Sequence, residues 1–419
     1  MHAEGRITGV SDDGLGTLET GGRHIYVPFA YPGDVVRVRG TKRRFGRLLA
    51  RDFELLEPSS LRRAPGCPHF GKCGGCLWQG LNYREQLKLK VELFERITGV
   101  SARIKGSPKI WGFRNVGNFI VTTEGIGMKG YGRPFDVADL SECPVFSKRT
   151  PEYLRALRAF LKETRLRPWN PREKRGDVHY LQVREGKFTG EVMVNLIAHR
   201  EPLEEVAEAF GDYFSSDSLY WSLKTDGRDD PHGEPELIAG KPFIRERIGG
   251  ITYLLHPNSF FQTNSYALKL LLRAVEDFTD GERVLDLYSG VGTFGVWLAK
   301  RGFAVDGVEA NPFAVEMARR NAELNDVNAE FRVGRAEETP IGEYDTAVVD
   351  PPRKGLRETA ESLVKSGVER VVYVSCNPKA FRLDYANHLR KAYRIDGAVL
   401  IDMFLHTPHV EAVILLVRI

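Results

Sequence analysis

The C-terminal part of the chain alternates short apolar strands with amphipathic helices, and this rhythm constrains its fold more than any other feature. Apolar runs predict strands over 283–287, 304–309, 346–349 and 371–374. Helices are expected between the earlier strands, over 294–300 and 312–324. Such alternation predicts a Rossmann-like, doubly wound and mostly parallel sheet, in which functional groups gather at the carboxyl ends of the strands.

The region before this sheet is expected to form two further domains. Residues 1–58 contain several short strands with Asp13-Gly14 at a hairpin turn, a spacing typical of a small β-barrel of the OB type. Residues 61–254 mix strand-like and helical runs, which predict an α+β middle domain with an antiparallel sheet. Residues 255–419 complete a multidomain α/β protein.

The distribution of charge is more informative than the net charge of +4. Seven basic residues and no acidic residue lie between Arg37 and Arg51. Such a block is typical of a surface that binds the phosphates of a nucleic acid, although a solvated basic edge strand has the same composition.

The chain shows no sign of export. It has no apolar segment long enough to span a membrane, and its first residues lack the apolar region of a secretion signal. The odd number of cysteines, five, argues against a disulfide framework. We expect a cytoplasmic protein that acts as a monomer and has no membrane partner.

A glycine-rich turn follows the first strand of the expected sheet. Gly290 and Gly292 allow a tight turn at which a ligand can approach the backbone. Glu309 ends the next strand, where a carboxylate can accept the hydroxyls of a ribose. This pattern predicts a ligand that contains adenosine, and both NAD(P) and S-adenosylmethionine fit it.

A rigid acidic turn, Asp350-Pro351-Pro352, follows a later strand of the same sheet. Both prolines fix φ and lack an N–H group, so the aspartate and the backbone carbonyls are free to face a planar base. The motif is typical of methyltransferases that act on nitrogen or carbon atoms of nucleobases. The alternative is a rigid loop without a ligand.

Three more residues are candidates for the chemistry. Cys376 follows an apolar strand and is interpreted as a nucleophile, the alternative being a thiol in the core. Glu411 begins a strongly apolar strand, where loss of solvation raises the pKa of a carboxylate and suits a general base. Gln262 offers a donor and an acceptor to a uracil edge or a methionine tail, or belongs to a helix-capping segment.

These motifs, in this order, resemble those of the RNA 5-methyluridine methyltransferases, which use S-adenosylmethionine to methylate uracil C5. The resemblance covers essentially the whole chain and rests on the segments Phe261-Gln262, 286–294, 350–353, 375–378 and 409–411. It implies a class I methyltransferase domain at the C-terminus and an N-terminal TRAM barrel that binds RNA.

The resemblance also implies residue roles. Cys376 would be the nucleophile and Glu411 the base. The cofactor or the uracil would be lined by Gln262, Tyr288, Gly290, Gly292, Thr293, Glu309 and Asp350. Arg335 departs from the family pattern near the adenine, where an amide or an acid is common.

The chemistry of the family accounts for these residue types. Uracil C5 is a poor nucleophile until a thiolate adds at C6 and turns the ring into an enolate, after which C5 takes the methyl group. A base then removes the C5 proton and the thiol is eliminated. The target base must leave its stack to reach such a pocket.

The remaining cysteines form a cluster in sequence. Cys67, Cys73 and Cys76 are close together, and Cys143 lies far downstream. Zinc and an iron–sulfur cluster both take four thiolates, and the spacing does not separate them. The resemblance implies a [4Fe-4S] cluster with a structural or RNA-binding role; zinc, or no metal, are the alternatives.

The predicted activity is methylation of uridine C5 in structured RNA, through a covalent bond between Cys376 and C6. We expect the T-loop uridine of tRNA as substrate, with a uridine of 23S rRNA as the alternative. A non-catalytic RNA-binding protein that kept the fold is a hypothesis of another class. An RNA 5-methylcytosine methyltransferase is the rival among enzymes, but the sequence around Cys376 lacks its usual Thr-Cys or Pro-Cys context.

Overall fold

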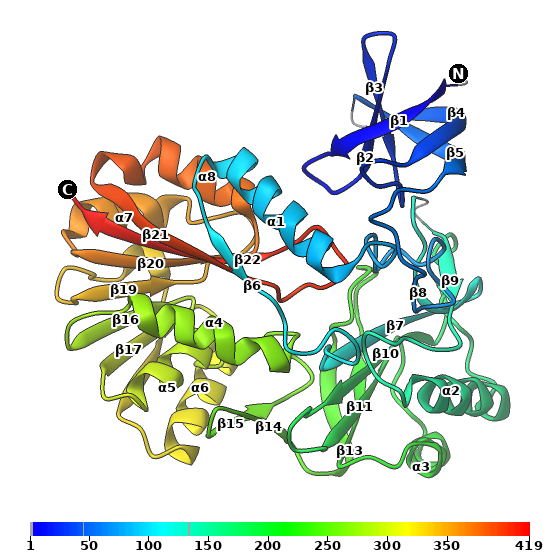
Figure 1. Ribbon diagram of the computed structural model, residues 1–419. Helices are drawn as coiled ribbons and strands as arrows, with labels where there is room; N and C mark the ends of the chain where they lie inside the picture. The colour runs from blue at the N-terminus through cyan, green and yellow to red at the C-terminus, as the bar shows by residue number, and fades with distance from the viewer. Residues whose placement is uncertain (1–2, 45, 133–134) are drawn as a thin grey trace.

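The computed structural model describes residues 3–44, 46–132 and 135–419. The chain forms an N-terminal barrel, a middle domain and a large C-terminal sheet with helices on its faces (Figure 1). None of the described helices combines the length and the apolar character that crossing a membrane requires.

The N-terminal segment closes into a five-stranded barrel in the order β1-β2-β3-β5-β4, which confirms the predicted OB-like fold. Its strands are β1 (Ala3–Val10), β2 (Gly16–Thr20), β3 (Arg23–Val27), β4 (Val35–Arg44) and β5 (Arg47–Glu57). Gly14, in the β1–β2 turn, has φ +79°, a conformation that glycine adopts without strain.

The basic block of the barrel is partly neutralised by acids from neighbouring strands. Arg37 pairs with Glu4 at 2.8 Å, and Arg39 pairs with Glu54 at 2.6 Å. Residues 37–51 contain no acid, but strand pairing brings acidic side chains of β1 and β5 next to the arginines of β4. The phosphate-binding surface expected there is therefore less positive than its sequence suggests.

The middle domain contains a seven-stranded sheet in the order β13-β12-β11-β10-β7-β8-β9. Its strands are β7 (Val116–Thr122), β8 (Gly125–Lys129), β9 (Val137–Asp139), β10 (Val178–Glu185), β11 (Val192–Ala198), β12 (Ser218–Leu223) and β13 (Glu234–Gly240). Helices α2 (Thr150–Thr164) and α3 (Glu204–Tyr213) share a core with one face of this sheet. The sheet is antiparallel as expected except for β11 and β12, which α3 connects in parallel.

The C-terminal sheet has eight strands in the order β18-β17-β16-β19-β20-β22-β21-β6. The strands are β6 (Arg103–Lys105), β16 (Arg283–Leu287), β17 (Ala304–Glu309), β18 (Ala329–Val333), β19 (Thr346–Val349), β20 (Arg370–Ser375), β21 (Tyr393–Ile401) and β22 (Glu411–Arg418). Strand β22 runs antiparallel to its neighbours and the other pairs are parallel. The doubly wound fold is confirmed, with this one reversed strand.

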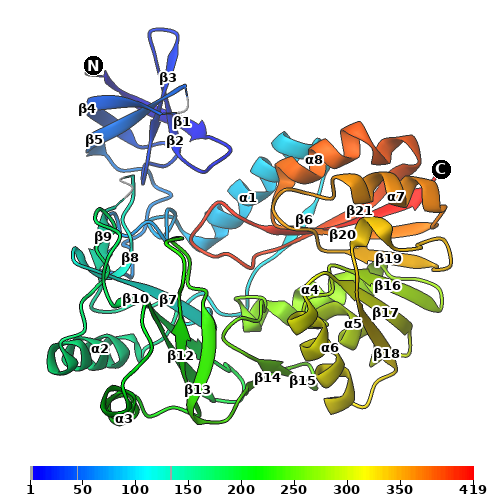
Figure 2. The same cartoon turned by 180° about the vertical axis from the view of Figure 1, so that it is seen from behind.

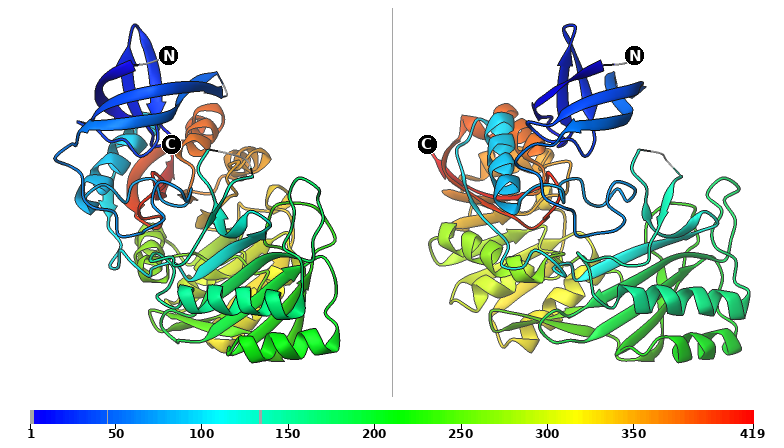
Figure 3. Two further views of the ribbon diagram at one scale, coloured as in Figure 1. Left: turned by 90° about the vertical axis from the view of Figure 1, so that its right-hand side faces the viewer. Right: turned by 45° about the vertical axis from the view of Figure 1, so that its right-hand side comes forward.

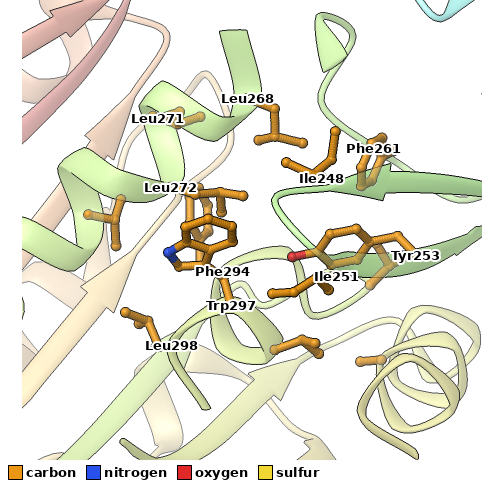
Figure 4. Close-up of a cluster of buried hydrophobic side chains, with 14 of the residues drawn as sticks. Ile248, Ile251, Tyr253, Phe261, Leu268, Leu271, Leu272, Phe294, Trp297 and Leu298 are labelled. Atoms are coloured by element: carbon orange, nitrogen blue, oxygen red, sulfur yellow. The ribbon is translucent and has the colours of Figure 1, made fainter. Parts of the chain in front are cut away.

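Helices cover both faces of this sheet (Figures 2 and 3). They are α4 (Ser265–Phe278), α5 (Thr293–Ala299), α6 (Pro312–Leu324), α7 (Glu358–Ser366) and α8 (Pro378–Asn387), with short 3₁₀ turns at Ala336–Glu338 and Leu389–Lys391. The core beside α4 and α5 centres on Trp297 and Tyr253 (Figure 4).

The expected limits of the middle and C-terminal domains, 61–254 and 255–419, do not coincide with the packing units. Helix α1 (Tyr83–Thr98) packs on α8, and β6 extends the C-terminal sheet beside β21. The hairpin of β14 (Ile244–Ile248) and β15 (Ile251–Leu255) also contributes side chains to the core around Trp297. The α1–β6 segment and the β14–β15 hairpin pack with the C-terminal domain because their apolar side chains are buried in its cores.

Candidate active site and cysteine cluster

Three of the predicted side chains meet at one edge of the C-terminal sheet. Cys376 follows β20, Asp350 follows β19 and Glu411 begins β22. Ser375 pairs with Ala412, so the antiparallel register brings Cys376 opposite Glu411 at the next position. Strand pairing therefore fixes the proposed nucleophile beside the proposed base.

Burial raises the pKa values of the three side chains at this edge of the sheet. Glu411 is only 2% exposed, and burial, with the nearby charge of Asp350, raises its pKa well above the usual range. Burial also raises the pKa of Asp350 to about 7. Burial and the charges of Glu411 and Asp350 raise the pKa of the Cys376 thiol to about 11, while Arg353 acts in the opposite direction. The free protein thus holds a neutral thiol beside carboxyl groups whose affinity for protons is raised.

The glycine turn after β16 leaves open space beside its backbone at Gly290. Gly290 and Gly292 have φ of +54° and +79°. The Gly290 N–H donates to one oxygen of Glu309 at 3.2 Å, and the Asn311 N–H donates to the other at 2.9 Å. These bonds hold the Glu309 carboxylate beside the turn, in a position suited to accept ribose hydroxyls.

Asp286, which the sequence analysis did not include among the site residues, is the most perturbed acid of this turn. Its Oδ2 accepts from the Gly295 N–H at 2.9 Å, whereas its Oδ1, like Ser289 Oγ, is buried and finds no hydrogen-bond partner among the described residues. Burial raises the pKa of Asp286 to about 8, and Asp350 and Glu309 add to the shift. Buried polar atoms without partners are rare in folded proteins, and here they fit a polar ligand.

The other predicted cofactor residues occupy different environments. Gln262 is 5% exposed, and its backbone carbonyl accepts from Asn115 Nδ2 at 2.8 Å. Thr293 is buried at the first position of α5. The Tyr288 hydroxyl hydrogen-bonds Thr359 Oγ1 at 2.8 Å, so this side chain packs towards α7.

Arg335, the expected departure from the family pattern, lies on the surface. Its side chain is 62% exposed and pairs with Glu337 at 2.5 Å and with Glu338 at 3.7 Å. The arginine thus neutralises acids of the same loop.

A cavity of about 220 Å³ opens beside Cys376. Its walls include Arg353 and His409, together with Lys90 of α1, Lys379 of α8 and Asp12 of the barrel. None of the last three was predicted as a site residue from the sequence, because they come from segments without a recognisable motif.

Proteins of known name match this chain over its whole length. A Pyrococcus horikoshii protein named 23S rRNA (uracil(747)-C(5))-methyltransferase is 60% identical and covers 100% of both chains. A Pyrococcus abyssi protein named tRNA (uracil(54)-C(5))-methyltransferase is 45% identical and covers 99% of this chain and 100% of its own. The chain belongs to the RNA uracil-C5 methyltransferase family. Its activity is S-adenosylmethionine-dependent methylation of uracil C5 in RNA.

Family models match three parts of this methyltransferase. Residues 3–61 match the TRAM domain of tRNA (uracil(54)-C(5))-methyltransferase, residues 256–372 the methyltransferase small domain, and residues 334–419 tRNA (Uracil-5-)-methyltransferase. The crystal structure of the Pyrococcus abyssi tRNA (uracil-54, C5)-methyltransferase in complex with S-adenosyl-L-homocysteine superposes with a TM-score of 0.89. That chain is 43% identical, with 99% of this chain and 100% of that chain covered.

The four remaining cysteines of the methyltransferase gather in space. Cys67, Cys73, Cys76 and Cys143 line one cavity of about 40 Å³ in the middle domain. Burial raises the pKa of Cys76 to about 12 and that of Cys143 to about 11. Within the part of the chain that is described, no three His, Cys, Asp or Glu side chains are arranged as a ready metal site.

Proposed function

We propose that this enzyme methylates a uridine of 23S rRNA. Three relatives named 23S rRNA (uracil(747)-C(5))-methyltransferase are each 60% identical to it over nearly the full length. Three relatives named tRNA (uracil(54)-C(5))-methyltransferase are 43–45% identical. The higher identity to the rRNA enzymes supports 23S rRNA as the substrate. The tRNA expected from the sequence alone becomes the second candidate.

The proposed roles follow from the edge of the sheet. The Cys376 sulfur bonds to uracil C6, and C5 takes the methyl group that S-adenosylmethionine supplies. Glu411 then accepts the C5 proton, the C5–C6 double bond forms again, and the bond between sulfur and C6 breaks so that Cys376 leaves as the thiolate. Because the thiol of the free protein has a pKa of about 11, Cys376 must pass its proton to a neighbouring group before it attacks.

The cofactor is proposed to lie against the glycine turn. Gly290 and Gly292 would let it approach the backbone, Glu309 would bind its ribose, and Gln262, Thr293 and Asp350 would line the remaining surface. The buried, unpartnered oxygens of Asp286 and Ser289 support this assignment. Tyr288 would contribute its backbone, since its hydroxyl is bonded to Thr359.

The substrate is tested by mapping 5-methyluridine in rRNA and tRNA from a strain that lacks the gene. Loss of the modification from 23S rRNA alone is expected, and loss from tRNA alone would overturn the substrate proposal. The mechanism is tested with Cys376→Ala, which should abolish methyl transfer and the covalent adduct with RNA that contains 5-fluorouridine. Full activity of that variant would refute the role of the cysteine.

The cysteine cavity is proposed to hold a [4Fe-4S] cluster bound by Cys67, Cys73, Cys76 and Cys143. Four soft sulfur donors on one cavity fit such a group. These residues would join the loop 67–76 to the turn at Cys143, and the bond from the Gly74 N–H to the Lys129 carbonyl, 2.9 Å, already ties this loop to β8. Anaerobic purification should give a visible absorbance band and iron; stoichiometric zinc without iron would contradict the assignment.

Two further expectations belong to this proposal. An enzyme that modifies rRNA would act in the cytoplasm, and one chain carries all the candidate catalytic residues, which supports a monomer. Light scattering of the purified protein should give a mass near 47.2 kDa.

A further inference from the structure

The β1–β2 turn of the barrel reaches the mouth of the Cys376 cavity. Gly14 approaches Pro408 so closely that a Cβ on the glycine would lie 2.5 Å from the proline ring. The Trp78 indole N–H also donates to the Gly14 carbonyl at 2.9 Å. The turn therefore lies beside the loop that leads to Glu411, and both line the Cys376 cavity.

Asp12, at the tip of this turn, joins two cations from separate helices. Its carboxylate lies 3.0 Å from Lys379 Nζ and 3.2 Å from Arg96 Nη2. Burial raises the pKa of Asp12, but the hydrogen bonds and charges of Lys379 and Arg96 outweigh it, so the pKa is lowered and the carboxylate stays ionised. Lys379 follows Cys376 by only three positions, which places the ion cluster beside the nucleophile.

A carboxylate at this position conflicts with the substrate. A uridine that enters the cavity brings its own phosphate groups to the mouth, where a negative side chain repels them. The same two cations form a suitable pair for a phosphate oxygen, because lysine and arginine are the usual partners of the RNA backbone. The charge arrangement is complementary to a phosphodiester only after Asp12 has withdrawn.

We propose that Lys379 and Arg96 form a binding site for an RNA phosphodiester beside the target uridine, and that Asp12 occupies this site until RNA displaces it. The proposal rests on the RNA substrate of the proposed function. In the free enzyme Asp12 offsets the repulsion between the two cations, and Arg96 Nη2 also donates to the Val10 carbonyl at 2.9 Å. In the complex the phosphate replaces the Asp12 carboxylate as the anion that pairs with Lys379 and Arg96.

The test is the affinity of the full-length enzyme for a protein-free 23S rRNA transcript, measured without cofactor. Removing the competitor in Asp12→Asn should lower the Kd by about 3–10-fold, a range expected for breaking exposed ion pairs. Lys379→Gln should raise the Kd and reduce the slope of log K against log salt by about one. In the double variant the gain from Asp12→Asn should shrink markedly.

Glu19→Gln is the matched control. Glu19 lies on β2 of the same barrel, its side chain is 61% exposed, and its carboxylate is 3.8 Å from His24 Nδ1. This variant also removes one negative charge but should change the Kd by less than about 2-fold, because its charge acts only at long range.

The outcomes are distinguishable. If Asp12→Asn binds RNA no better than Glu19→Gln, or binds it more weakly than the wild type, Asp12 is a structural clamp and the inference is wrong. Should Asp12→Asn fail to fold, unchanged affinity and salt slope in Lys379→Gln would refute it instead. Failure of the wild type to methylate any RNA would overturn the proposed function itself.

Discussion

Replacing Lys90 with methionine should destabilise the methyltransferase domain strongly. Lys90 of α1 and Asp402 form an ion pair at 2.5 Å in which both side chains are 0% exposed. Lys90 Nζ also donates to the Phe404 carbonyl at 3.0 Å, and in the described part of the chain Asp402 Oδ2 has no hydrogen bond of standard geometry. Without the lysine, Asp402 becomes a buried carboxylate that has lost its ion-pair partner and keeps only the Tyr83 hydroxyl nearby, which costs about 3–5 kcal/mol of the free energy of unfolding.

Calorimetry and urea unfolding would measure this loss. A penalty of that size should lower the Tm of the C-terminal domain by on the order of 10 °C, because each kcal/mol shifts the Tm of a domain of this size by about 2–4 °C. The double variant Lys90→Met with Asp402→Leu should recover most of the stability, because an apolar pair can replace a buried ion pair at little cost. A single variant within about 1 kcal/mol of the wild type, or a double variant as unstable as the single, would refute the reasoning.

Two further predictions concern the cofactor side of the site. The pKa of Asp286 is raised to about 8 in the fold, so the free energy of unfolding of the cofactor-free protein should fall as pH rises from about 4 to about 8. Asp286→Asn should reduce this slope in urea unfolding; parallel pH profiles would contradict the pKa shift. Arg184 is 7% exposed and donates to the Pro257 and Ser259 carbonyls at 3.2 and 2.7 Å. Arg184→Met should raise the KM for S-adenosylmethionine through the segment that carries Gln262 and leave RNA affinity unchanged; an unaltered KM would exclude this positioning role.

Local sequence signals predicted the elements and most of the candidate site. The strand over 283–287 and the helix over 312–324 have the bounds that the pattern predicted. Cys376 and Asp350 could be predicted because parallel strands bring their carboxyl ends to one edge of the sheet. A polar residue directly after an apolar run is therefore expected at that edge. Asp286 belonged to the predicted glycine turn but received no role, because its special character is a buried carboxylate with one oxygen unpartnered among the described residues, which no residue type reveals.

The order of the elements and the motifs at the strand ends can be read from the sequence, since both follow from short-range apolar periodicity. Tertiary structure alone decided the pairing of β6 with β21, the ion pair between Lys90 and Asp402, and the placement of Asp12 beside Lys379. Lys90 and Asp402 stand 312 positions apart, and no local pattern encodes such a contact. It arises only when the apolar face of α1 is buried against the C-terminal domain, which carries the lysine into the interior with it.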